Sequence, residues 1–193
     1  MSGNVKKNLE GLGCTVYHIT NQLDIRKTRV IDSRFNHHIV RIDSQDEIDS
    51  LTLEYLESVK EDISKIDFDA VVVSDYNKGF LQYNLVKEFV SFTREIVGDI
   101  PVFVDTKKTT CDCFESVILK INHSESKNMV SKPKDSEIVV TLGKNGAKWN
   151  GKYFSGYETE VYDVCGAGDT FLSGLVYMYL YSNKSMEKSI NFA

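Results

Sequence analysis

Apolar positions follow two spacings along the 193-residue chain, and these spacings predict a succession of helices and strands. A spacing of three or four residues predicts amphipathic helices over 46–66 and 85–97, and a short one that stops at Gly11–Gly13. Short continuous apolar runs predict strands at 70–73, 102–104 and 117–121. Strands without alternation, separated by helices, are typical of a parallel sheet covered on both faces. The pattern therefore predicts an α/β fold.

Further elements complete this pattern at both ends of the chain. β-forming residues predict a strand at 15–20, a hairpin over 26–43, and a strand at 160–164. An Asn-Gly turn predicts a second hairpin at 149–153. Residues 126–136 are polar and contain a proline, which indicates a surface loop. Residues 170–181 are apolar on nearly every face, as in a helix packed on a sheet, and a last helix begins at Ser185.

Length, charge and cysteine usage limit the possible classes of protein. The chain fits one domain over residues 1–193. Its 28 acidic and 23 basic side chains give a net charge of −5 without a long basic run, so we expect no nucleic-acid partner and no membrane partner. The first residues lack the apolar core of a signal peptide, and the four cysteines lack disulfide or zinc spacing. We expect a cytoplasmic protein with reduced thiols.

The richest chemistry lies where a glycine-rich turn, residues 163–168, runs into the apolar helix. Gly166 and Gly168 allow backbone N–H groups to converge, and the helix N-terminus adds partial positive charge, so the turn suits a phosphate. A carboxylate there, Asp169, could take a proton from an attacking hydroxyl. The alternative is that Asp169 only caps the helix. Phe171 replaces the third glycine of a dinucleotide fingerprint, and no Gly-Lys-Ser/Thr of a P-loop follows.

Residues 163–171 resemble the Asp-x-x-Gly-Ala-Gly-Asp-Thr-Phe signature of the ribokinase-like (PfkB) carbohydrate kinases. The resemblance implies that Asp169 is the catalytic base and that Gly166, Ala167 and Gly168 form an anion hole with it. It also implies a three-layer α/β/α fold with a mostly parallel central sheet and a small β lid. Cys165 departs from the family, which usually has Thr or Ser there.

Two further stretches resemble the family's nucleotide site. The string Asn122, His123, Ser124, Glu125 resembles Asn-x-x-Glu after a strand, which implies contacts with ATP and, through Glu125, indirect contact with Mg²⁺. Residues 138–147 resemble Val-Thr-x-Gly-x-x-Gly, whose glycines let a nucleotide approach the backbone. The resemblance thus assigns the nucleotide also to Thr141, Gly143 and Gly146.

Other stretches resemble the family's sugar site. Residues 2–13 resemble its glycine-asparagine segment, which implies that Ser2, Gly3 and Asn4 lie beside the sugar; the alternative is that Asn4 caps a helix. The hairpin over 26–43 resembles the lid, through which subunits of the family often pair, so a homodimer is possible. Substrate-binding residues on the hairpin and on the loop 74–79 resemble those of the heptose-7-phosphate kinase branch: Lys27, Arg29, Arg41, Asp75 and Lys78. The alternative for these charges is a solvated surface.

Together the resemblances imply an enzyme that uses ATP and Mg²⁺ to phosphorylate a hydroxyl of a sugar or sugar phosphate, with heptose 7-phosphate as the expected acceptor. Family members also have a first strand before the position of Met1 and an adenine-pocket segment after that of Ala193, and we expect this chain to lack both. The alternative is a shortened, catalytically idle ribokinase-like protein that binds a metabolite or a protein partner. Retention of Asp169 with its glycines favours the kinase.

Overall fold

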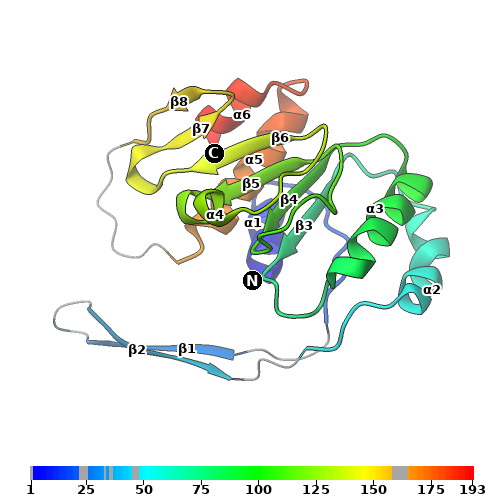
Figure 1. The fold of residues 1–193 in the computed structure, drawn as a ribbon, viewed down its shortest axis with the longest axis horizontal. Helices are drawn as coiled ribbons and strands as arrows, with labels where there is room; N and C mark the ends of the chain where they lie inside the picture. Colours follow the sequence, from blue (N-terminus) through cyan, green and yellow to red (C-terminus); the bar gives the residue numbers. More distant parts are fainter. Residues whose placement is uncertain (1, 22–25, 33, 35–36, 45–47, 158–164) are drawn as a thin grey trace.

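A six-stranded sheet forms the centre of the protein in the computed structural model, which describes residues 2–21, 26–32, 34, 37–44, 48–157 and 165–193 (Figure 1). Four strands pair in parallel, in chain order: β3 (Val71–Asp75), β4 (Val102–Thr106), β5 (Ile118–Asn122) and β6 (Glu137–Thr141). Two strands continue the sheet in antiparallel pairing: β7 (Ala147–Trp149) and β8 (Lys152–Phe154). The predicted α/β fold with a mostly parallel sheet is confirmed.

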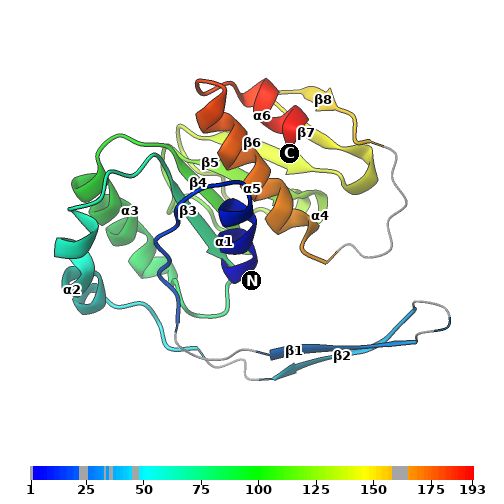
Figure 2. The same cartoon turned by 180° about the vertical axis from the view of Figure 1, so that it is seen from behind.

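Helices cover both faces of this sheet, which gives three layers (Figures 1 and 2). One face packs against α1 (Ser2–Gly11), α5 (Ala167–Tyr181) and α6 (Met186–Phe192). The other face packs against α2 (Leu53–Ile63) and α3 (Tyr83–Val97). Two short helices follow strands: α4 (His123–Asn128) and η1 (Gly143–Asn145). Among the described helices, none is long and apolar enough to cross a membrane.

The alternation of side chains along β4 and β5 decides which residues reach the site. Phe103 and Ile118 belong to the core beneath α1 and α5, whereas Val104 and Leu119 belong to the core beneath α2 and α3. Successive side chains of a strand point to opposite faces, so positions two residues further return to the same face. Asp105 and Lys120 therefore point toward the α1 and α5 side, at the carboxyl ends of their strands.

Several predicted boundaries differ from the structure. The helix predicted over 46–66 begins only after Thr52, whose hydroxyl accepts a hydrogen bond from the Tyr55 N–H at 3.2 Å and thereby starts α2. The strand predicted at 15–20 is wrong: this segment has no ladder partner among the described residues, and β3 is an edge strand there. Residues 126–128 are the end of α4 and not yet loop. The strand predicted at 160–164 lies outside the described residues.

A separate two-stranded sheet extends away from the central sheet (Figure 1). It consists of β1 (Arg26–Asp32) and β2 (His37–Ser44), which pair antiparallel and set Arg29 opposite Arg41. Ile39 and Ile42 are 64% and 54% exposed on it. The hairpin itself matches the sequence prediction, while its role as a lid and the assignment of 1–193 to one domain stay predictions.

The second hairpin, β7 and β8, has the predicted Asn-Gly turn. Asn150 and Gly151 both have positive φ, 47° and 79°, as a two-residue hairpin turn requires. Just before β7, Gly146 has φ +85°, and a Cβ there would overlap the backbone oxygen of Phe154 and lie 2.5 Å from the Gly156 nitrogen. Glycine at position 146 is thus required by chain packing.

We expect Gly146→Ala to lower the free energy of unfolding by about 3 kcal/mol, from the left-handed backbone and the overlap together. Gly151→Ala is the matched control, because Gly151 has φ +79° but no atom within 4 Å of an added Cβ. The control should lose only about 1–2 kcal/mol. Urea denaturation measures both values, and equal losses would mean that the overlap contributes nothing.

Candidate active site

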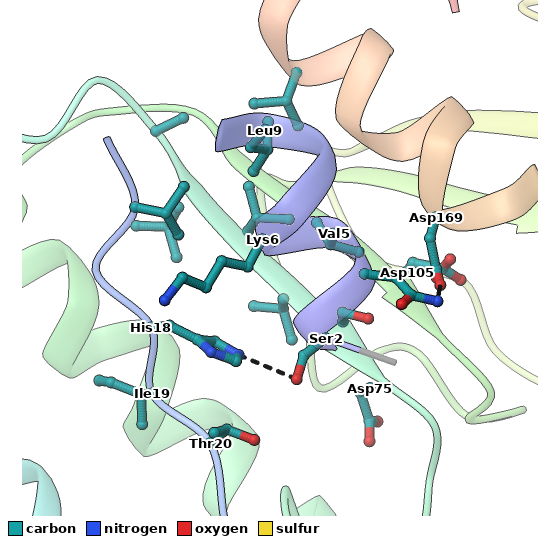
Figure 3. A pocket seen from close by; sticks show the side chains of 18 of the residues that line it. Ser2, Val5, Lys6, Leu9, His18, Ile19, Thr20, Asp75, Asp105 and Asp169 are labelled. Atoms are coloured by element: carbon teal, nitrogen blue, oxygen red, sulfur yellow. Dashed lines mark hydrogen bonds between the residues drawn. The ribbon is translucent and has the colours of Figure 1, made fainter. Parts of the chain in front are cut away.

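A cleft opens at the carboxyl ends of the parallel strands, beside α1 and the start of α5 (Figure 3). Most residues that the sequence assigned to a site line it: Gly3, Asn4, Asp75, Lys78, Asn122, His123, Ser124, Thr141, Gly143, Gly166, Gly168 and Asp169. The lining residues that it did not assign to the site include Tyr76, Asp105, Lys107 and Lys120. The carboxyl edge of an open α/β sheet is the usual place for a ligand.

Asp169 is a buried carboxylate at the beginning of α5, with 2% of its surface exposed. One carboxylate oxygen, Oδ1, accepts a hydrogen bond from the Tyr76 hydroxyl at 2.7 Å. The other, Oδ2, accepts one from the Asn4 amide at 3.2 Å, which Figure 3 marks at the start of α5. Both oxygens thus have partners outside α5, so capping is not the role of Asp169. Asn4 lies within α1, so it is not the helix cap either.

Gly166 begins α5 in the left-handed conformation, with φ +84°. The first-turn N–H groups of Ala167, Gly168 and Asp169 have no intrahelical acceptor, so they are donors for an anion. A Cβ at Gly168 would lie 2.8 Å from the Lys120 Nζ. Glycine at this position therefore lets a buried ammonium approach the backbone of the first turn of α5.

A row of polar side chains crosses three strands beneath the first turn of α5. Ser74, Asp105 and Lys120 are successive ladder partners on β3, β4 and β5. Lys120 Nζ donates to Asp105 Oδ2 at 2.7 Å, and each of these two side chains is 3% exposed. Ser74 Oγ and Asp105 Oδ1 are buried without a hydrogen-bond partner among the described residues. Buried polar atoms normally have partners, so this row is suited to a polar group entering from the cleft.

Asn122 and Glu125 form a capping box at the start of α4, because each side chain accepts from the other's backbone N–H. Glu125 also forms an ion pair with Lys107, whose Nζ lies 3.7 Å from Asp105 Oδ1. Burial lowers the pKa of Lys107, but the hydrogen bond to Glu125 and the two carboxylates outweigh it and raise that pKa overall. Lys107 is therefore a cation at neutral pH.

Tyr76 contacts both Asp169 and Lys107. Its hydroxyl donates to Asp169, and Lys107 Nζ lies 5.5 Å from the centre of its ring. Burial, followed by the hydrogen bond to Asp169 and the nearby carboxylates, raises the pKa of the Tyr76 hydroxyl. The hydroxyl therefore stays protonated at neutral pH and remains a donor to Asp169.

The start of α1 is held by a contact across the cleft. Ser2 Oγ lies 3.1 Å from His18 Nε2, and Figure 3 shows this pair on the side of α1 that faces residues 18–20. Burial, followed by the nearby Lys6 ammonium, lowers the pKa of His18, so the ring is neutral at pH 7. This contact helps to fix the helix that carries Gly3 and Asn4.

Asp75 lines the cleft, but its contacts are internal. Its Oδ2 accepts from Thr106 Oγ1 at 2.8 Å and pairs with Lys108 Nζ at 2.9 Å, and its Oδ1 accepts from the Asn77 N–H at 2.9 Å. Both charged side chains are buried. These contacts describe a structural ion pair, and substrate binding by Asp75 stays a prediction.

The residues near Glu125 fit a divalent cation in part. Asp105 Oδ1 and the Glu125 carboxylate are hard oxygen donors, which Mg²⁺ prefers. Within the described part of the chain, no group of three or more His, Cys, Asp and Glu is placed to hold a metal ion. Mg²⁺ is often bound by one or two carboxylates together with substrate phosphates, so the site fits a metal that arrives with a nucleotide.

The other predicted site residues lie at the start of α5, just before β7 and on the separate hairpin. Ala167 is in the first turn of α5, and Gly146 packs against the backbone of β8 and the residues after it. Lys27, Arg29 and Arg41 lie on the separate hairpin, and their contact with a ligand stays a prediction.

Of the residues that sequence reasoning missed, Lys120 had a recognisable signal: a lone charge inside an apolar strand indicates an internal ion pair.

The fold and the cleft define an α/β protein in which a helix N-terminus lies beside a buried carboxylate. Residues 99–193 match the family model described as pfkB family carbohydrate kinase. Curated relatives match most of the chain in sequence, and solved structures match most of it in fold. Residues 99–193 thus belong to the pfkB family of carbohydrate kinases, and the chain has the ribokinase-like fold.

Two of the curated relatives are each named "Bifunctional protein HldE". The protein of a Nitratiruptor species is 30% identical over 196 residues, covering 90% of this chain and 40% of that protein. The protein of Geobacter sulfurreducens is 31% identical over 180 residues, covering 78% of this chain and 35% of that protein. The chain thus spans about 40% of the length of such relatives.

Solved structures with the same fold are sugar kinases by name. Phosphofructokinase-2 from Escherichia coli in complex with fructose-6-phosphate has a TM-score of 0.62 at 16% identity, over 85% of this chain and 60% of that one. Ribokinase from Thermotoga maritima has a TM-score of 0.57 at 17% identity, over 98% of this chain and 67% of that one. These similarities establish the fold.

We expect Asp75→Asn to lower the free energy of unfolding by about 3 kcal/mol, because it leaves Lys108 as an unpaired buried cation. The double variant Asp75→Asn with Lys108→Met should recover part of this loss. Glu95→Gln is the control, because its ion pair with Lys60 is exposed and should contribute little to stability. Urea denaturation compares them, and a double variant as unstable as Asp75→Asn would contradict the ion-pair account.

Proposed function

We propose that this protein is an ATP-dependent carbohydrate kinase that transfers the γ-phosphoryl group of ATP to a hydroxyl of a sugar or sugar phosphate. The observation that carries the proposal is the buried Asp169 carboxylate, which Asn4 and Tyr76 hold in the cleft beside the first turn of α5. A base next to an anion-binding helix N-terminus can serve phosphoryl transfer.

In the proposed reaction Asp169 takes the proton of the acceptor hydroxyl. The acceptor oxygen then bonds to the γ-phosphorus, the bond from that phosphorus to the β–γ bridging oxygen breaks, and ADP leaves with the electron pair. The backbone N–H groups of residues 167–169 donate to the oxygens of the transferring group. Because these donors and the base belong to one helix turn, they hold the two reacting groups in a fixed relation.

Lys120 is the cation that we assign to the transferring group. Its ammonium has one hydrogen-bond acceptor, Asp105, among the described residues, and it lies against Gly168. An ammonium has three donors, so two remain for phosphate oxygens. Mg²⁺ bound near Glu125 with the nucleotide would neutralise further charge on the phosphates.

We propose the nucleotide site along the edge formed by α4 and the segment after β6. Asn122, His123, Ser124, Thr141 and Gly143 line the same cleft as Asp169, which supports phosphate contacts at this edge. Glu125 forms an ion pair with Lys107, which lines the same cleft. Gly146 follows Gly143 by one turn of η1, and its contribution is part of the proposal. Use of ATP is consistent with a cytoplasmic location.

For the acceptor we propose a phosphorylated sugar, with heptose 7-phosphate as the specific candidate. The loop 74–79 and residues 27–29 resemble the heptose-7-phosphate kinase branch. A phosphate group on the acceptor needs cations, and Lys78 lines the cleft. Lys27, Arg29 and Arg41 would join it if the hairpin covers the sugar. A structural neighbour crystallised with fructose-6-phosphate supports a phosphorylated acceptor.

We also propose that the hairpin of β1 and β2 pairs with a second copy of the chain. A two-stranded sheet alone is marginally stable in water, and this one exposes apolar residues on its strands. The exposed apolar side chains are Val30, Ile31, Ile39, Val40 and Ile42. A homodimer would bury them and fix the lid.

Asp169→Asn should keep the fold and lower turnover by ~10²–10⁴, the range for loss of a general base. Asparagine can keep one oxygen acceptor and has nearly the same volume, so circular dichroism and thermal unfolding should change little. The measurement is the rate of ADP formation with the best acceptor. Turnover equal to that of the parent would exclude Asp169 as the base.

Lys78→Ala should raise KM for phosphorylated acceptors by about tenfold, the effect of losing one charge-assisted hydrogen bond. Ribose is the internal control, because it has no phosphate for the lysine to bind. The comparison uses kcat/KM of both proteins for heptose 7-phosphate, fructose 6-phosphate and ribose. A preference of the parent for ribose, or an equal effect on all three, would contradict the proposed acceptor class.

A further inference from the structure

Two carboxylates border the nucleotide side of the cleft, and one cation lies between them. Lys107 Nζ forms an ion pair with Glu125 Oε1 and lies 3.7 Å from Asp105 Oδ1. Asp105 Oδ1 is buried and has no hydrogen-bond partner among the described residues. The Asp105 side chain is 3% exposed, whereas that of Lys107 is 34% exposed. The lysine can therefore leave this place more easily than the aspartate can.

A pair of carboxylates with a spare oxygen is also what a hard divalent cation prefers. The described residues supply only these two carboxylates, since they contain no group of three or more His, Cys, Asp and Glu able to hold a metal ion. A divalent cation here needs further oxygen ligands, and nucleotide phosphates can supply them. The ammonium of Lys107 and such a cation would compete for the same two carboxylates.

The charges of this cluster explain what the competition would do. Asp105 and Glu125 are negative, and Lys107 and Lys120 are positive, so the cluster is neutral. A bare divalent cation would leave an uncompensated double charge in a partly buried site, which is unfavourable. A metal-bound nucleotide is an anion overall, and its phosphates can accept the hydrogen bonds that Lys107 gives up.

We propose that Lys107 acts as a tethered cation. Its ammonium occupies the position between Asp105 and Glu125 that a divalent cation would take, so the site accepts the metal only together with a nucleotide. When the metal nucleotide binds, the ammonium leaves Glu125 and pairs with a phosphate oxygen. The identity of the arriving ligand rests on the proposed function, whereas the exclusion of the free metal depends only on the observed cluster.

Titration of Mn²⁺, a detectable substitute for Mg²⁺, into the nucleotide-free protein tests this exclusion. We expect Lys107→Met to bind one Mn²⁺ at least tenfold more tightly than the parent does, because the neutral side chain releases both carboxylates. Lys107→Arg keeps the positive charge and should bind Mn²⁺ as weakly as the parent. Electron paramagnetic resonance of free Mn²⁺ measures the affinities. Equal affinity of the parent and Lys107→Met overturns the proposal.

The double variant Lys107→Met with Asp105→Asn locates the metal. It should lose the gain in Mn²⁺ affinity, because it removes the orphaned carboxylate oxygen that the metal would use. A gain that persists would mean that the metal binds elsewhere, and this result also overturns the proposal.

A measurement on the parent alone keeps the test independent of whether Lys107→Met folds. The parent protein is labelled with ¹³C-lysine, and the Cε resonance of Lys107 is assigned as the one that is missing from Lys107→Arg. This resonance should not change with MgCl₂ and should shift with MgATP. A shift with MgCl₂ alone overturns the tethered-cation proposal. A lysine that responds to neither addition, in a protein that shows no other response to MgATP, contradicts the proposed kinase function and the movement of Lys107 together.

Discussion

The site depends on the burial of one carboxylate. Asp169 is almost inaccessible to water, and a buried charge is costly unless hydrogen bonds replace its solvation. Its two donors, Asn4 and Tyr76, come from positions 165 and 93 residues away along the chain. Asn4 is in reach because α1 packs beside α5 on the same face of the sheet, and Tyr76 because it directly follows β3 at the carboxyl edge of that sheet. The arrangement of elements that buries the apolar core is thus also the one that holds this carboxylate.

The charged groups around this carboxylate alternate in sign. From the start of α5 toward α4, the order is Asp169, Lys120, Asp105, Lys107 and Glu125. Ion pairs join the last four, and Lys120 lies against Gly168, the neighbour of Asp169. Such alternation keeps the buried cluster close to neutral, while leaving donors of the ammonium groups and of the α5 backbone directed at an incoming anion. Under the proposed function, a phosphate would meet Lys120 and the α5 backbone donors already in place, and only Lys107 would have to move.

Local patterns in the sequence predicted the parts of the structure that depend on local chemistry. The strands, the main helices, the Asn-Gly turn and the glycine-rich start of α5 follow from spacing and turn residues. The contacts of Tyr76, Lys107 and Lys120 could not be predicted, because they join residues of different elements that only the tertiary structure brings together. The strand expected at 15–20 failed for a related reason: a β-forming segment becomes a strand only when a neighbour pairs with it.

The most direct test of this account is to look for the phosphorylated product itself. ³¹P NMR of the parent protein with MgATP and heptose 7-phosphate should show a new phosphate monoester resonance that grows in step with ADP, as transfer from ATP to a sugar hydroxyl requires. ADP together with inorganic phosphate, or no consumption of ATP with any sugar or sugar phosphate tested, would contradict it. A protein that bound a metabolite or a partner without chemistry would give the second result.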